Sequence, residues 1–168
     1  MSNQALNSQV PSALTAFVRL ANAHGAMERA FNQELQAAGR ITVTDFEVLR
    51  RLADAPDGRM RRIDLAHAVG VTPSGITRLL DGLEASELVG RHHCTQDHRV
   101  TYAVITNAGR DVLRATAATH LAGLVSLFAE RFTQNELNQL VTLLGRLPGA
   151  DSDLSCPAAA VEPVTVES

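Results

Sequence analysis

The fold is decided by ten residues near the middle of the chain, Val71-Thr72-Pro73-Ser74-Gly75-Ile76-Thr77-Arg78-Leu79-Leu80. Thr72 is a typical N-cap residue, and Pro73 suits the first helical position, where a missing N–H leaves no hydrogen bond unmade. The apolar residues of the predicted helix recur every three or four positions, namely Ile76, Leu79, Leu80 and Leu83. Its opposite face carries short or polar residues, namely Ser74, Gly75, Thr77, Arg78 and Asp81.

A second, shorter amphipathic run precedes this helix. It consists of Ile63, Leu65, Ala66 and Val69, and Gly70 ends it. Two short helices joined by a tight turn predict a helix-turn-helix, whose second helix is offered to the major groove of DNA. An ordinary helical hairpin within a bundle fits this segment equally well.

The residues after the helix favour the first interpretation. Two β-prone runs, 88–93 and 100–105, flank the polar tip 94–99 and predict a β-hairpin. A helix-turn-helix followed directly by a β-hairpin is the layout of a winged helix.

Two motifs in this region resemble a known family. Asp97-x-Arg99 followed by Val104-Ile105-Thr106-x-x-Gly109 resembles the wing signature of the MarR family (multiple antibiotic resistance regulators). The segment 71–91, with Ser74-Gly75-Ile76-Thr77-Arg78-Leu79 and then Leu83-Glu84-x-x-x-Leu88-Val89-x-Arg91, is similar to that family's recognition helix and following strand. With the flanking helices, the resemblance covers residues 10–147.

The fold class expected is mainly α with a small β-hairpin wing. Residues 10–147 form one domain, in which 44–105 are the winged helix-turn-helix and 10–40 and 107–147 are dimerisation helices. We expect a flexible N-terminus over 1–9 and a disordered acidic tail over 148–168. Two capping boxes are predicted, Thr44-x-x-Glu47 and Thr133-x-x-Glu136.

The terminal helices are expected to need a shared core. The first carries an apolar stripe of Val10, Leu14, Phe17, Val18, Ala21, Met27, Phe31 and Leu35. A helix of this length must bury such a stripe. The resemblance implies that it packs with the C-terminal helices of a second subunit, which predicts a homodimer with two recognition helices about one DNA turn apart. The alternative is a monomer whose terminal helices pack only on each other.

Composition indicates a cytoplasmic protein of one domain. The 168 residues contain no apolar run that we expect to span a membrane, no signal-peptide pattern, and only two cysteines, Cys94 and Cys156. The net charge of −3 is low for a DNA-binding protein, but the tail carries four acidic residues and no basic one. Without the tail, 15 basic residues, all of them arginines, stand against 14 acidic ones. Support for DNA binding is therefore local.

The DNA-contacting candidates lie on the recognition helix and the wing. Short hydroxyls and arginine suit phosphates and guanine edges, and the candidates are Ser74, Gly75, Thr77, Arg78, Arg61, Arg62, Arg91, His98 and Arg99. Arg99 resembles the family residue that enters the minor groove, and Asp97 is expected to orient it. For Arg78 the alternative is an ion pair with Asp81, Glu84 or Asp64. Arg61 and Arg62 fit solvated charges better, and Arg91 fits a structural role beneath the wing.

Neither a metal site nor a catalytic site is predicted. His92, His93, Cys94 and His98 match no standard zinc spacing, and neighbours on a strand point to opposite faces. No phosphate loop, nucleophile elbow or carboxylate pair is visible, and a lone His24 or His120 on a long helix fits packing or solvation. We therefore expect no enzyme activity and no cofactor.

The function expected is a homodimeric transcription repressor of a pseudo-palindromic operator in double-stranded DNA. The resemblance implies release by a small aromatic or phenolic effector, bound between the dimerisation helices and the winged module. Helix faces suggest four lining residues, namely Phe17, His24, Met27 and Phe46, although core packing suits the three apolar ones. Two alternatives are a winged-helix module for protein contacts and an architectural DNA binder without an effector.

Overall fold

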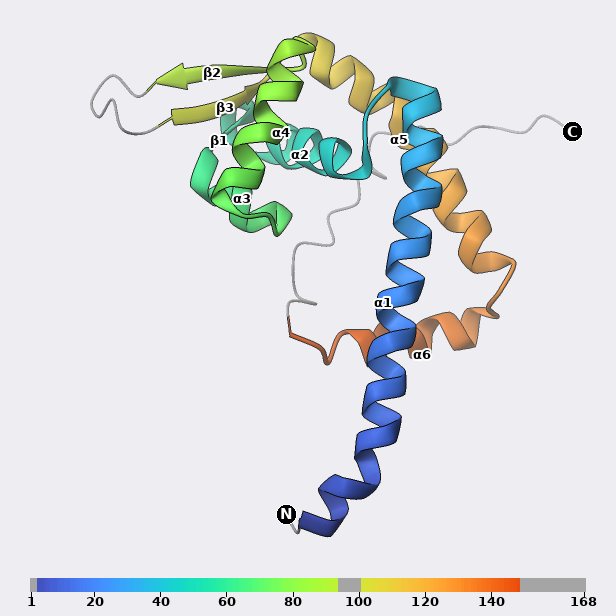
Figure 1. Ribbon diagram of the computed structural model, residues 1–168. Helices are drawn as coiled ribbons and strands as arrows, with labels where there is room; N and C mark the ends of the chain where they lie inside the picture. The colour runs from blue at the N-terminus through green and yellow to red at the C-terminus, as the bar shows by residue number, and fades with distance from the viewer. Residues whose placement is uncertain (1–2, 94–100, 149–168) are drawn as a thin grey trace, which may run out of the picture.

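The computed structural model describes residues 3–93 and 101–148. The chain forms helices α1 (Asn3–Gly39) and α2 (Val43–Asp54), a 3-10 turn η1 (Pro56–Gly58), strand β1 (Arg59–Arg61), and helices α3 (Arg62–Val69) and α4 (Pro73–Ala85). Strands β2 (Val89–His93) and β3 (Thr101–Ile105) and helices α5 (Asn107–Ala129) and α6 (Gln134–Leu144) follow. The mainly α fold with a small sheet is confirmed. The winged module lies at one end of α1, and the other end of α1 projects beyond the rest of the chain (Figure 1).

Helices α3 and α4 form the expected helix-turn-helix. The Oγ1 of Thr72 accepts a hydrogen bond from the Gly75 N–H at 3.1 Å and caps α4, with Pro73 in the first turn. Gly70 ends α3 with φ of 72°, a left-handed conformation that favours glycine. On the inner side of α4, Ile76, Leu80 and Leu83 are buried, and each stabilises the fold by roughly 1.5–3 kcal/mol.

The sheet has three strands in the order β1-β3-β2, all antiparallel. β2 and β3 pair from Val89 opposite Ile105 to His93 opposite Thr101, as the hairpin prediction requires. β1 is an addition, with Arg59 opposite Val104. Its three residues are too few for an alternating pattern, and only pairing with β3 makes them a strand.

The core joins the winged module to the long helices. It contains Leu35 of α1, Leu113 of α5, and residues of α2, α3, α4 and the sheet. Phe46, Leu49 and Leu52 of α2 are buried. Ile63 is not, because the first turn of α3 leaves it 52% exposed. Gly109 lets α5 approach the sheet closely, since a Cβ there would lie 2.2 Å from the carbonyl oxygen of Leu88.

The first predicted capping box is wrong by two residues. Thr42, not Thr44, caps α2: its Oγ1 accepts from the Asp45 N–H at 3.1 Å, and the Asp45 carboxylate accepts from the Thr42 N–H at 2.8 Å. Glu47 is instead hydrogen-bonded to Arg50 and Arg51.

The second predicted box, Thr133 with Glu136, is confirmed at the start of α6. The backbone N–H of Thr133 hydrogen-bonds the Glu136 carboxylate and lowers its pKa.

The terminal helices differ from expectation in two ways. α1 begins at Asn3, within the segment 1–9 that was expected to be flexible; Pro11 lies inside the helix, where it removes one backbone donor. By length and composition alone, α5 could cross a membrane, which the sequence analysis did not anticipate. This is weak evidence for a span, because the first half of α5 buries Leu113 and Thr116 against the rest of the fold.

Candidate nucleic-acid interface

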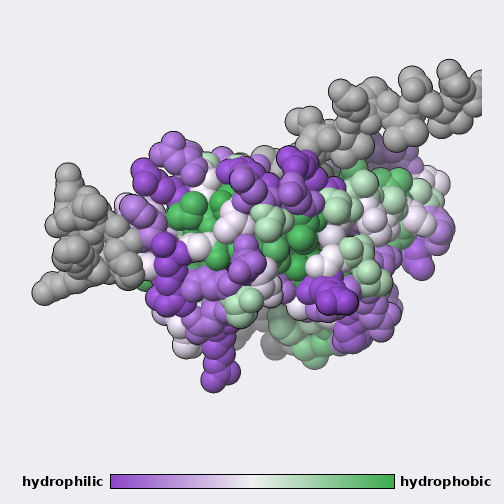
Figure 2. Space-filling model, turned by 90° about the horizontal axis from the view of Figure 1, so that it is seen from above, coloured by the Kyte–Doolittle hydropathy of each residue, from purple (hydrophilic) through white to green (hydrophobic). Residues whose placement is uncertain are grey.

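The outer face of α4 is polar and open. Ser74 and Arg78 are exposed, and Gly75 and Thr77 are half-buried. Arg78 makes no hydrogen bond or ion pair with any residue that the structure describes. The alternative of an ion pair from Arg78 to Asp81, Glu84 or Asp64 is therefore absent among these residues. Hydrophilic side chains dominate much of the winged module in the view from above, with smaller apolar patches between them (Figure 2).

Thr77 is tied to both helices of the motif. Its hydroxyl donates to the Pro73 carbonyl at 2.9 Å and accepts from the guanidinium of Arg62 in α3. The interpretation of Arg62 as a solvated charge is therefore wrong: it is half-buried and bonded to the recognition helix. Because the single hydroxyl proton of Thr77 is already donated, Thr77 can offer DNA only an acceptor or its methyl group.

The first turn of α4 is organised by its cap. The Oγ atoms of Thr72 and Ser74 lie 3.2 Å apart, and a Cβ added at Gly75 would lie 3.1 Å from Thr72 Oγ1. Gly75 therefore keeps the cap uncrowded and adds no side chain to the outer face. A ligand backbone can approach α4 closely at this turn.

Two further candidate arginines are neutralised by carboxylates. Arg61 donates to Asp64 at 2.7 Å. Arg91 of β2 pairs with both Glu84 and Asp81 of α4. The hydrogen bond that Arg91 donates to Glu84, aided by the one to Asp81, raises the pKa of Arg91 above its usual range. This clamp fastens the wing strand to the recognition helix, as a structural role for Arg91 requires.

Several predicted residues lie outside the described residues. These are Cys94, Asp97, His98 and Arg99 of the predicted hairpin tip, and Cys156 with the acidic segment beyond residue 148. His92 lies on β2 and is exposed. Within residues 3–93 and 101–148, no group of three or more His, Cys, Asp or Glu side chains is placed to hold a metal ion.

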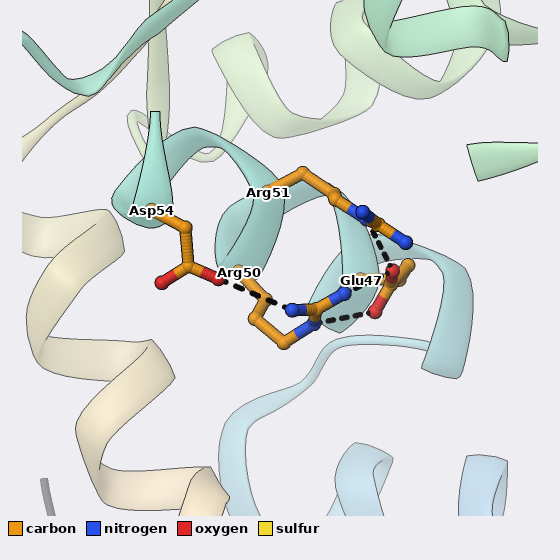
Figure 3. A network of polar contacts seen from close by, with 4 residues as sticks. All are labelled: Glu47, Arg50, Arg51 and Asp54. Carbon is orange, nitrogen blue, oxygen red and sulfur yellow. Dashed lines mark hydrogen bonds and ion pairs between the residues drawn. The ribbon is translucent and has the colours of Figure 1, made fainter. Parts of the chain in front are cut away.

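A polar network of four side chains lies along α2 (Figure 3). Arg50 donates to Glu47 through Nε at 2.8 Å and Nη2 at 2.7 Å, and to Asp54 at 3.1 Å. Arg51 also reaches Glu47, at 2.8 Å. Burial alone would raise the pKa of Glu47, but the hydrogen bonds and charges of the two arginines together lower it. Glu47 is therefore ionised at neutral pH.

Comparison with known proteins identifies this arrangement. Residues 41–101 match the model of the MarR family, and this range includes the helix-turn-helix and β2. The chain carries a MarR-family domain. AbsC of Streptomyces coelicolor, a MarR family transcriptional regulator, is similar at 27% identity over 78% of this chain and 88% of its own, with a TM-score of 0.70.

Two other solved structures agree. Sco3205 of Streptomyces coelicolor, a MarR family regulator solved in complex with DNA, is 25% identical over 81% of this chain and 89% of its own, with a TM-score of 0.70. The transcriptional regulator BldR of Sulfolobus solfataricus is 25% identical over 83% of this chain and 99% of its own, with a TM-score of 0.65. The likeness therefore extends beyond the MarR-family domain to the long helices.

A cavity of about 650 Å³ lies between the MarR-family domain and the long helices. Its walls come from α1, α2, α5 and the turn between α3 and α4, which contributes Gly70 and Val71. Of the four predicted pocket residues, His24 and Met27 line it. Phe17 does not, since it lies farther along α1 and is 70% exposed; Phe46 is buried in the core.

Among the lining residues that sequence reasoning missed are His120 and Glu47. The ring of His120 lies 5.0 Å from Phe31 and 4.9 Å from Phe46, between centroids. Burial lowers the pKa of His120, although Glu34 and Glu47 oppose this effect. The spacing of His120 from Leu113 and Ala117 on α5 was the available signal, but it fits a solvated histidine as well.

Proposed function

We propose that this protein is a homodimeric transcription repressor that binds a pseudo-palindromic operator and is released by a small effector. The observation that carries the proposal is the outer face of α4: a capped helix with exposed Ser74 and Arg78, and no partner for Arg78 among the described residues. The relative Sco3205, which shares this fold, was solved with DNA bound. Phosphate contacts would position the motif and Arg78 would read a base.

The apolar surface of the long helices supports a homodimer. On α1, Leu14, Phe17, Val18 and Leu20 are 43–70% exposed. On α5 and the C-terminal part of the chain, a second set is exposed, namely Val125, Phe132, Val141, Leu143, Leu144 and Leu147. Apolar surface of this extent is unusual for a monomer. A second copy that covers it would give a twofold dimer with two α4 helices about one DNA turn apart.

Effector control is supported by where the cavity lies. The long helices line it on one side. On the other side it is lined by the end of α3 and the turn that follows, through Val69, Gly70 and Val71. A ligand there that prefers one arrangement of these elements would change the spacing of the two recognition helices. We propose a cytoplasmic location. We assign no catalytic activity, because nothing among the described residues resembles a catalytic set.

A salt titration of DNA binding tests the proposal. One duplex is the intergenic segment upstream of the protein's own gene, and the other is a scrambled duplex of equal length. We expect affinity for the first to exceed that for the second by roughly a thousandfold, with a steep decline as salt rises. Equal weak binding to both duplexes refutes a repressor and favours a protein-contact module; equal tight binding favours an architectural protein.

A further inference from the structure

We propose that the cavity selects a planar ligand that is neutral or positively charged and carries N–H donors, and that His120 is a specificity-determining residue. This inference rests on the proposed function, since it names the effector class of the same site. Three observations support it, namely the charge of the cavity wall, the unpartnered nitrogens of His120, and the shape and polarity of the lining.

The cavity wall is acidic. Glu28 and Glu47 line it, and the described lining contains no arginine. Arg50 and Arg51 bond Glu47 along α2, but neither lines the cavity. Glu28 forms no ion pair or hydrogen bond with a described residue. A carboxylate ligand would therefore meet the unpaired charge of Glu28 with no arginine in the described lining to receive it, whereas a cation would be attracted.

His120 presents unsatisfied nitrogen atoms. Its ring is fixed between Phe31 and Phe46 and lines the cavity. Neither ring nitrogen hydrogen-bonds a described residue, and Nδ1 is buried. Because burial lowers the pKa of His120, the ring is neutral at pH 7 and one nitrogen is an acceptor. The unsatisfied ring favours a ligand that can hydrogen-bond it, and a ligand N–H can satisfy the nitrogen that accepts.

The rest of the lining suits a planar apolar body. Met27, Phe31, Val43, Leu124 and Phe128 contribute apolar surface. A volume of about 650 Å³ lies within the ordinary range of small-molecule sites. A bound cation would also compete with Arg51 for Glu47, which places the ligand's charge in contact with the polar network on α2.

Three naphthalene probes of matched shape test the inference, namely 2-naphthoate, 2-naphthamide and 2-naphthamidine. Binding is measured by titration calorimetry on the full chain without DNA, so that the result does not depend on the proposed function. We expect the amide and the amidine to bind at least tenfold more tightly than the carboxylate. Operator release by each probe is then measured separately by fluorescence anisotropy.

Two variants identify the responsible side chains. His120→Phe keeps an aromatic ring against Phe31 and Phe46 but removes both nitrogens, and it should weaken the amide at least fivefold. Glu28→Gln removes an exposed charge, and it should weaken the amidine while leaving the amide unchanged. Thermal unfolding of both variants confirms that the fold is retained.

The outcomes separate the two proposals. Carboxylate binding as tight as amidine binding overturns the inference, as does the failure of all three probes to bind at millimolar concentration. An unchanged affinity of His120→Phe for the amide overturns the role of His120. The expected selectivity without any operator binding supports the inference and refutes the proposed function.

Discussion

Arg78 provides the sharpest test of the proposed DNA-binding face. Arg78→Ala in a homodimer removes two guanidinium groups per operator. One bidentate contact to guanine is worth about 1–3 kcal/mol, so two independent contacts are worth about 2–6 kcal/mol. Even the lower value raises the Kd for the operator about 30-fold, since 1.4 kcal/mol corresponds to a factor of ten.

The same substitution should leave the fold intact. Because Arg78 is exposed and has no partner among the described residues, we expect the protein's free energy of unfolding to change by no more than about 0.5 kcal/mol. Arg114→Ala is the matched control. It removes an equal charge, paired with Asp111 on the exposed side of α5, and should leave operator binding within about twofold of the wild type, since distant exposed charges are screened at 0.15 M salt.

Fluorescence anisotropy with the operator and scrambled duplexes at several salt concentrations is the assay. Loss confined to the operator indicates that Arg78 reads a base. Loss on both duplexes, with a salt slope lowered by about 0.9 for each lost contact, indicates a phosphate contact. If Arg78→Ala binds the operator as tightly as Arg114→Ala does, the assignment of the outer face of α4 to DNA is refuted.

Three further predictions concern stability and pH. Thr72→Ala removes the cap on Gly75 N–H and should lower the free energy of unfolding in urea by about 1 kcal/mol. Gly109→Ala places a Cβ 2.2 Å from the Leu88 carbonyl oxygen and should cost about 3 kcal/mol by the same measurement. His120→Phe should reduce the loss of stability in acid. Because folding lowers the pKa of His120, the unfolded chain binds its proton more readily, so this contribution is present above about pH 6.5 and declines as pH falls through the lowered value.

Controls for these predictions use neighbouring positions. Thr72→Ser keeps the capping hydroxyl, and a loss equal to that of Thr72→Ala would contradict the capping role. Gly82→Ala, where nothing lies within 4 Å of the added Cβ, should stabilise α4 by roughly 0.5–1 kcal/mol; a Gly109→Ala protein as stable as this one would contradict the steric argument. The His120 prediction fails if wild type and variant show the same change of Tm between about pH 8 and about pH 5.5, both sides of the ordinary histidine pKa.

The recognition helix could be predicted from sequence because its signals are local. The cap Thr72, Pro73 in the first turn and the apolar spacing of Ile76, Leu80 and Leu83 act within one or two turns of the chain. The hairpin and the capping box at Thr133 are of the same kind. Each depends on a backbone preference or on the spacing of apolar residues, and neither requires contacts with distant parts of the chain.

Local signals were ambiguous where two partners compete. Thr42 and Thr44 each have an acidic residue three positions on, and sequence alone favoured the Glu47 box. In the fold, Arg50 and Arg51 hold Glu47 while Asp45 completes the cap of α2. The short strand β1 likewise exists only because β3 lies beside it.

The partners of the charged residues were decided by the tertiary structure alone. Sequence spacing offered Asp81 and Glu84 as alternative partners of Arg78, but β2 brings Arg91 to both carboxylates and leaves Arg78 open. The cavity around His120 is assembled from α1, α2, α5 and the turn at Gly70, which are far apart in the chain. Helix formation depends on neighbours in sequence, whereas ion pairs and cavities depend on neighbours in space, and packing of the elements determines those.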